Sequence, residues 1–139
     1  MTSFYQHWSD APAEAWRWPH FAPREIASKG DGSLLADPDA LDRLEALRQA
    51  VGEPIRLLSA YRDPIHNALV GGAPRSLHKL GRAFDIPAPP RLRGLLLAAA
   101  RQAGFAGLGF YQTFLHVDTG PARSWFGGGL SKEAWSGLV

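Results

Sequence analysis

The sequence predicts an α+β fold, because two helical patterns are interspersed with short strand patterns along the chain. Helices are expected over residues 37–52 and between residues 89 and 104, and strands over residues 82–86, 108–111 and 114–118. With 139 residues and no linker or internal repeat, residues 1–139 are expected to form a single domain with its own core.

The first helix has clear start and stop signals. Asp37 can accept hydrogen bonds from the free amides of the first turn, and Pro38 stands where a missing N–H has no effect. Gly52 follows the last turn, where a left-handed conformation is common. One face is apolar and is expected to be buried, and the opposite face is charged and is expected to meet solvent: Ala40, Leu44, Leu47 and Val51 on the first, Asp42, Arg43, Glu45 and Arg48 on the second.

The other elements are shorter. Residues 54–61 are expected to form a strand that leads into a polar segment over residues 62–67, and residues 71–74 indicate a loop. The second helix follows two prolines and should present one apolar face, consisting of Leu92, Leu95, Leu96, Ala99 and Ala103. The last two strands are joined by Gln112 and Thr113, which predicts a hairpin.

The two ends of the chain differ from the middle in composition. Residues 1–24 are rich in aromatic side chains and broken by prolines, and we expect them to wrap over the core as an irregular segment rather than to form a binding surface. A short helix is expected at residues 23–27. The tail, residues 120–139, is glycine-rich, with Trp125 and Trp135 as expected anchors.

Composition and charge narrow the possible functions. The chain has no cysteine, which excludes disulfides and thiolate metal sites. The net charge is +2, but the basic residues form no run. Only the overall charge would support nucleic-acid binding, and such binding is not expected. The longest apolar stretch, residues 95–100, is too short to span a membrane. Residues 1–8 lack the basic and apolar regions of a secretion signal, so no signal peptide is expected.

Three side chains are candidates for a metal site: His78, Asp85 and His116. Imidazole and carboxylate groups are ligands that Zn²⁺ accepts, and a catalytic zinc takes three protein ligands and a water. On a strand, Asp85 projects away from its apolar neighbours, and His116 and Asp118 share a face. If the two strands are neighbours, His116 and Asp85 converge and the loop with His78 closes the third side. The pattern predicts a zinc-dependent hydrolase. The other histidines, His7, His20 and His66, are expected to be structural or exposed.

Several short motifs occur in an order that resembles a known family. The motifs are Phe21-x-x-x-Glu25; Ser59-Ala60-Tyr61-Arg62 and Asn67; Ser76-x-His78-x-x-Gly81-x-Ala83-x-Asp85; Gly109-x-Tyr111; Phe114-x-His116-Val117-Asp118; and Gly120-Pro121-x-Arg123-x-Trp125. Together they resemble the M15 metallopeptidases, and more narrowly the D-Ala-D-Ala carboxypeptidase-like branch associated with phages and cell walls. The resemblance covers almost the whole chain, and the order of the motifs makes it specific.

The resemblance implies a small antiparallel sheet with flanking helices, as in the Hedgehog signalling domain and DD-peptidases. It implies one Zn²⁺ bound by His78, Asp85 and His116. It also implies hydrolysis of an amide bond in bacterial peptidoglycan peptides, commonly one that involves a D-amino acid, by a carboxypeptidase or an endopeptidase. The expected site of action is the bacterial cell wall or periplasm. It would be reached either through phage lysis or virion machinery or by a signal that has been removed, and a monomer is expected.

Three residues are considered for contact with the substrate. Arg62 can stabilise a tetrahedral oxyanion or bind a carboxylate in a bidentate manner, and the alternative is a surface ion pair with Asp63. Ser76 is expected to orient a ligand or bind the substrate backbone, unless it is only a loop residue. Tyr111 is expected to line the cleft or to pack against it.

The sequence differs from the wider family at the position where the general base is usually found. Many M15 enzymes have an acidic residue three positions before the second histidine ligand, and that position is Thr113 here. Asp118 is the nearest carboxylate, and it is expected either to act as the catalytic base or to orient His116. The departure at Thr113 leaves a second hypothesis open, in which the chain is a catalytically inactive zinc-containing module that binds cell walls or belongs to a virion.

Overall fold

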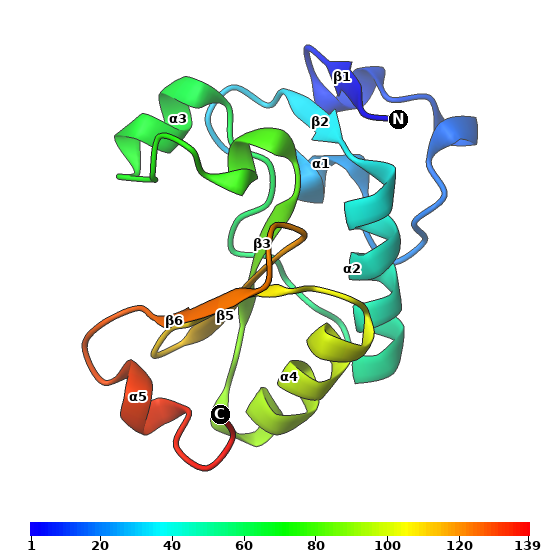
Figure 1. The fold of residues 1–139 in the computed structure, drawn as a ribbon. Helices are drawn as coiled ribbons and strands as arrows, with labels where there is room; N and C mark the ends of the chain where they lie inside the picture. Colours follow the sequence, from blue (N-terminus) through cyan, green and yellow to red (C-terminus); the bar gives the residue numbers. More distant parts are fainter.

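The computed structural model describes residues 1–139 and has a central sheet with two longer helices on one side (Figure 1). These helices, α2 (Pro38–Val51) and α4 (Arg93–Gln102), contact each other. The remaining helices are short: α1 (Pro23–Ile26), α3 (Pro64–Leu69) and α5 (Ser131–Ala134), with 3₁₀ turns at Trp8–Asp10, Ala13–Ala15, Leu77–Leu80 and Pro90–Leu92. The predicted α+β class is confirmed.

The sheet has four strands in the order β3-β5-β4-β6. Their bounds are Ala83–Pro87 for β3, Phe114–Asp118 for β5, Gly107–Phe110 for β4 and Arg123–Phe126 for β6. β5 pairs antiparallel with β3 and with β4, and the β4–β5 hairpin is as predicted. The edge strand β6 pairs parallel with β4, so the sheet is mixed rather than purely antiparallel.

The two faces of the sheet have different chemistry. Phe84, Ile86 and Leu115 project from one face and are buried in the same core as the apolar side chains of α2 and α4. The opposite face carries Asp85 and His116, at the alternate positions of the same strands. The alternation predicted from the sequence therefore places apolar side chains in the core and polar side chains together on the other face.

Helix α2 begins and ends as predicted. The Asp37 carboxylate accepts a hydrogen bond from Ala40 N at 3.0 Å, and Gly52 adopts the left-handed conformation with φ 77°. One prediction for this helix is wrong: Glu45 is buried rather than solvated, because His20 donates hydrogen bonds to its carboxylate from both its backbone and its ring. In α4, Leu95 is exposed and does not join the apolar face.

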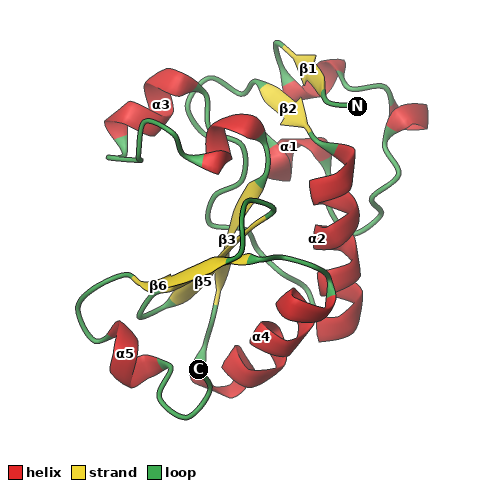
Figure 2. Cartoon of the chain, viewed as in Figure 1, coloured by secondary structure: helices red, strands yellow, loops and turns green.

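The strand predicted over residues 54–61 does not form (Figure 2). The chain makes a single bridge, between Ser59 and Asp85 of β3. It then leaves the sheet, because Tyr61 N donates to Ile26 O and Arg62 N donates to His78 O. The following polar segment contains α3, a helix that was not predicted although Asp63 caps it and Pro64 is its first residue.

The ends of the chain are more ordered than expected. Trp18 and Phe21 are buried, as predicted for a wrap over the core. In addition, β1 (Ser3–Tyr5) pairs antiparallel with β2 (Leu34–Ala36), a two-stranded sheet that was not predicted. In the tail, Trp135 is fully buried, as predicted for an anchor. None of the helices has both the length and the apolar character that crossing a bilayer requires.

Candidate metal centre

His78 lies on the 3₁₀ turn Leu77–Leu80, which follows the loop predicted from the sequence. The Ser76 hydroxyl caps this turn and accepts a hydrogen bond from His78 N at 3.2 Å. The ring is buried, and Nδ1 donates to the carbonyl of Ala60 at 2.7 Å. This bond fixes the tautomer, so Nε2 is left as the free ring nitrogen and lies 3.3 Å from Asp85 Oδ1.

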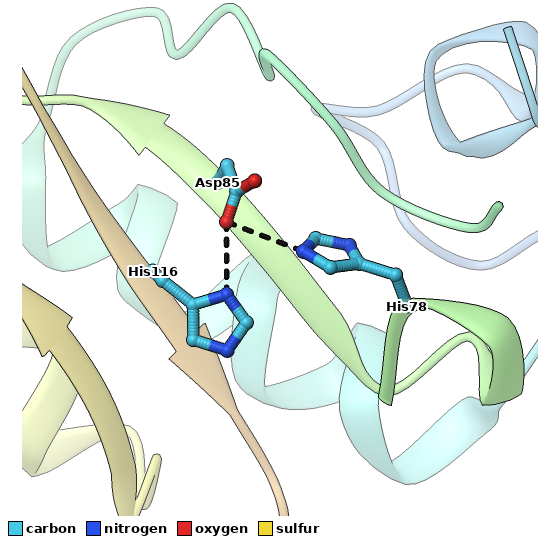
Figure 3. A group of neighbouring side chains, drawn as sticks. All are labelled: His78, Asp85 and His116. Carbon is cyan, nitrogen blue, oxygen red and sulfur yellow. Dashed lines mark hydrogen bonds and ion pairs between the residues drawn. The ribbon is translucent and has the colours of Figure 1, made fainter. Parts of the chain in front are cut away.

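Asp85 on β3 and His116 on β5 are directly opposite each other in the antiparallel register. His116 Nδ1 lies 2.9 Å from Asp85 Oδ1. Figure 3 shows the two imidazole rings approaching the same carboxylate oxygen from two sides. The predicted convergence of the loop and the two neighbouring strands is therefore present.

The donor set fits one Zn²⁺. Single ligand atoms from His78, Asp85 and His116 all lie within 4.8 Å of one another. Four donors placed tetrahedrally around zinc at 2.0–2.1 Å are about 3.3 Å apart, close to the separations of 2.9 Å and 3.3 Å that involve Asp85 Oδ1. Two imidazoles and one carboxylate make three protein ligands, the number that a catalytic zinc uses.

Opposing effects set the pKa values in the site. Burial raises the pKa of Asp85, but the interactions of its carboxylate with the His116 and His78 rings outweigh burial and hold the pKa well below its ordinary value. Burial lowers the pKa of His116, whereas hydrogen bonds with Asp118 and Asp85 raise it above its ordinary value overall. The two neighbouring carboxylates thus favour positive charge at the His116 ring. The same negative surroundings favour the binding of a divalent cation.

Asp118 is fully buried beside the centre, and its carboxylate is saturated with hydrogen bonds. Oδ1 accepts from Gly120 N at 2.9 Å and from Arg123 Nη1 at 2.8 Å. Oδ2 lies 2.8 Å from His116 Nε2 and accepts from Arg123 Nη2 at 2.7 Å. A carboxylate has about four lone-pair sites, and all of them are used here.

Arg62 lies in the cleft and contacts Asp85 rather than Asp63. Its Nη2 is 3.3 Å from Asp85 Oδ2, and its Nε donates to Ser59 Oγ at 2.9 Å. Asn67 Oδ1 accepts from Nη1 at 3.3 Å. The guanidinium is therefore held in place at the edge of the donor set.

The three ligand residues open onto a cleft of about 380 Å³. Ser76 and Tyr111 both line it. The Tyr111 ring stacks on Phe114 at 4.3 Å, and its hydroxyl accepts a hydrogen bond from Trp125 Nε1 at 3.1 Å. Tyr111 thus lines the cleft and packs against its wall, which are the two roles considered from the sequence.

Two further residues line the cleft: Arg123, for which the sequence predicted no role, and Trp125, which was expected only as an anchor of the tail. Arg123 and Trp125 are on β6, where the glycine-rich tail gave no strand prediction. Their spacing of two residues, soon after Asp118, is the signal for a shared strand face. Outside the cleft, His20 contacts Glu45 and His7 contacts Ser9, and neither they nor His66 belong to the metal cluster.

A model of the Peptidase M15 family matches residues 19–118, which include all three proposed ligands. The chain belongs to the Peptidase M15 family. This confirms the family predicted from the sequence motifs, and the donor set of the structure agrees with one Zn²⁺ in this M15 chain.

Two relatives illustrate what the M15 chain is similar to. It is 35% identical over 102 residues to the peptidoglycan L,D-endopeptidase MepK of Escherichia coli (strain K12), a match that covers 64% of this chain and 54% of the relative. It is 36% identical over 89 residues to the zinc D-Ala-D-Ala carboxypeptidase of Streptomyces albus G, covering 60% of this chain and 35% of the relative. The match thus spans about half the length of MepK and about a third of the carboxypeptidase.

Proposed function

We propose that this chain is a zinc peptidase that hydrolyses an amide bond in bacterial peptidoglycan peptides. The observation that carries the proposal is the convergence of His78 Nε2, Asp85 Oδ1 and His116 Nδ1 at an open cleft in an M15 chain. The names of the two relatives, one a peptidoglycan endopeptidase and one a zinc D-Ala-D-Ala carboxypeptidase, support this substrate class.

When bound, zinc supplies a water of lowered pKa and polarises the scissile carbonyl. The residues of the chain would hold the zinc and orient the groups around it. Asp85 and the two histidines present their donor atoms from elements that are already ordered by the sheet and by the Ser76 cap. Arg62 is the proposed oxyanion-stabilising residue, because its guanidinium lies beside the donor set and is oriented by Ser59 and Asn67.

The other cleft residues are proposed to bind the substrate and to orient the ligands. Ser76 and Tyr111 line the cleft and offer hydroxyl groups to a peptide backbone. For Asp118, saturation of the carboxylate supports the positioning role rather than that of the catalytic base. The exposed Thr113 has no ionisable group to take that place.

The finer details of fold and location also belong to this proposal. The sheet with flanking helices supports a fold of the kind shared by DD-peptidases and the Hedgehog signalling domain. The relatives' names support action at the bacterial cell wall, with delivery by phage lysis or virion machinery as the proposed route. A single domain that acts as a monomer is proposed.

One observation favours a second function. The only carboxylates that line the cleft are Asp85, a proposed ligand, and Asp118, which is saturated. A chain with this site could bind zinc and cell-wall peptides without hydrolysing them, as a binding or virion component. This module would retain peptidoglycan and zinc but release no product.

Turnover of purified muropeptides separates the two functions. The peptidase predicts products that disappear with chelator and reappear when zinc is restored, and no products from His78→Ala. Product formation by His78→Ala at the wild-type rate would exclude the proposed mechanism. Binding of muropeptides by the zinc-loaded wild type without any product would favour the second function.

A further inference from the structure

Two rows of residues cross the sheet on the side of the metal centre. In the first, Asp118 on β5 is opposite Gly107 on β4, which is opposite Arg123 on β6. In the second, His116 is opposite Gly109, which is opposite Trp125. In both rows a glycine separates a residue of the centre from a large side chain of the edge strand.

The glycines provide the space through which the edge strand reaches the centre. A Cβ on Gly107 would overlap the carboxylate of Asp118 and the guanidinium of Arg123. A Cβ on Gly109 would lie 2.6 Å from the indole of Trp125. Gly107 thus allows Arg123 to cross β4 and to bind Asp118 with two parallel hydrogen bonds.

Arg123 is itself held on several sides. Its Nη1 also donates to Pro121 O at 3.0 Å, and its guanidinium carbon lies 5.1 Å from the ring of Trp125. The Trp125 ring in turn lies 5.2 Å from the imidazole of His116. Bidentate pairing and an aromatic contact restrict the guanidinium to one orientation.

These contacts form a chain from β6 to the proposed zinc ligand. Arg123 fills two of the four acceptor positions of Asp118, and Asp118 Oδ2 then has one position directed at His116 Nε2. A metal binds the neutral ring, and with Nε2 donating to this oxygen the free nitrogen of that ring is Nδ1, which faces Asp85. Without Arg123, the carboxylate of Asp118 would lose two of its hydrogen bonds and could rotate, and the His116 ring would lose its fixed orientation.

We propose that Arg123 is a positioning residue of the metal centre, which acts through Asp118 to fix the tautomer and orientation of His116. This inference rests on the proposed zinc site and adds a residue to it. Arg123 forms no hydrogen bond or ion pair with the three ligand side chains, so we infer that its effect on zinc passes through the Asp118 carboxylate.

The test is a zinc competition titration of the full chain with a chelator of known affinity. Arg123→Ala should weaken zinc binding by about 10- to 100-fold, as expected for loss of an outer-sphere partner. Arg123→Lys keeps the positive charge but cannot form two parallel hydrogen bonds with the carboxylate, so it should lose less zinc affinity. Arg91→Ala is the matched control, because it removes an equally bidentate arginine–carboxylate pair, with Glu53, on the surface away from the centre. Its zinc affinity should equal that of the wild type.

A second readout separates positioning from general stability. In the zinc-loaded wild type, the His116 Nε2 proton should give a slowly exchanging NMR signal, because it is bonded to a buried carboxylate. This signal should be lost or broadened in Arg123→Ala and should persist in Arg91→Ala. Circular dichroism of the zinc-free proteins checks that the variants fold.

Each outcome decides the inference. Folded Arg123→Ala with wild-type zinc affinity and an intact Nε2 proton signal would overturn it. If Arg123→Ala does not fold, Arg123→Lys decides: weaker zinc binding with a broadened signal supports the inference, and wild-type behaviour overturns it. A wild type that binds no zinc would overturn the proposed site itself, and this inference with it.

Discussion

Asp85 and His116 are direct partners across β3 and β5, and their side chains meet with His116 Nδ1 2.9 Å from Asp85 Oδ1. The register of two strands thus sets the distance between two of the three proposed ligands. A slip of one residue would turn one ligand into the core, because successive side chains of a strand point to opposite faces. The same register buries Phe84 and Leu115, so packing of the core holds the metal centre in place.

His78 is predicted to be required for zinc binding, whereas His66 is not. His78→Ala removes one of three ligands and should leave the protein with much less zinc than one ion per chain after dialysis. His66→Ala is the matched control, because this histidine is on α3 outside the cluster. Metal analysis by mass spectrometry measures both. A full zinc complement in His78→Ala would show that the site is elsewhere.

Arg62 is predicted to act on turnover more than on zinc binding. Arg62→Ala should lower kcat/KM for a muropeptide by about 100-fold, the loss typical for one oxyanion-stabilising donor. In saturating zinc, the zinc content should stay at one ion per chain, because His78, Asp85 and His116 all remain. Steady-state kinetics together with metal analysis checks this prediction. Wild-type kcat/KM in Arg62→Ala would exclude the proposed role.

Glu45 is predicted to stabilise the fold in a pH-dependent manner. Burial raises the pKa of Glu45, but hydrogen bonds from His20 and Gln49 outweigh it, so the pKa lies below its ordinary 4.5. A lowered folded-state pKa means that the ionised group stabilises the protein above pH 4.5, and that this contribution is lost as the pH falls through the folded-state value. Glu45→Gln should therefore lower the free energy of unfolding by about 1–2 kcal/mol at neutral pH.

Urea unfolding of wild type and Glu45→Gln measures this difference across pH. The gap between the two proteins should close as the pH falls below 4.5. Glu14→Gln, at an exposed glutamate on the 3₁₀ turn Ala13–Ala15, is the control and should match the wild type at every pH. A gap of constant size across the whole range would show that ionisation of Glu45 is not its cause.

Features that depend on a few neighbouring residues were predictable from the sequence. Asp37 and Gly52 bound a helix through capping and backbone preference, which depend on a few neighbouring residues. The alternation around Asp85 and His116 indicated which face of each strand would carry polar groups. Asp85 and His116 were predicted to meet if their strands are neighbours, and the register confirms that the strands are neighbours.

Features that depend on distant partners were not predictable in this way. Residues 54–61 have a strand-like composition, but Tyr61 N bonds to Ile26 and so takes the chain away from the sheet. The sequence pattern places Glu45 on the charged side of its helix. Its burial depends on His20, which is distant in the sequence and donates a hydrogen bond to its carboxylate. Arg123 reaches Asp118 only because β6 pairs with β4 across Gly107, a parallel pairing that the glycine-rich tail does not indicate.

The most direct test of the metal centre is anomalous X-ray scattering at the zinc edge from crystals of the purified chain. The structure predicts one strong peak about 2.0–2.2 Å from each of His78 Nε2, Asp85 Oδ1 and His116 Nδ1. A zinc peak elsewhere in the molecule, or no peak from crystals grown with zinc, would contradict the proposed metal centre.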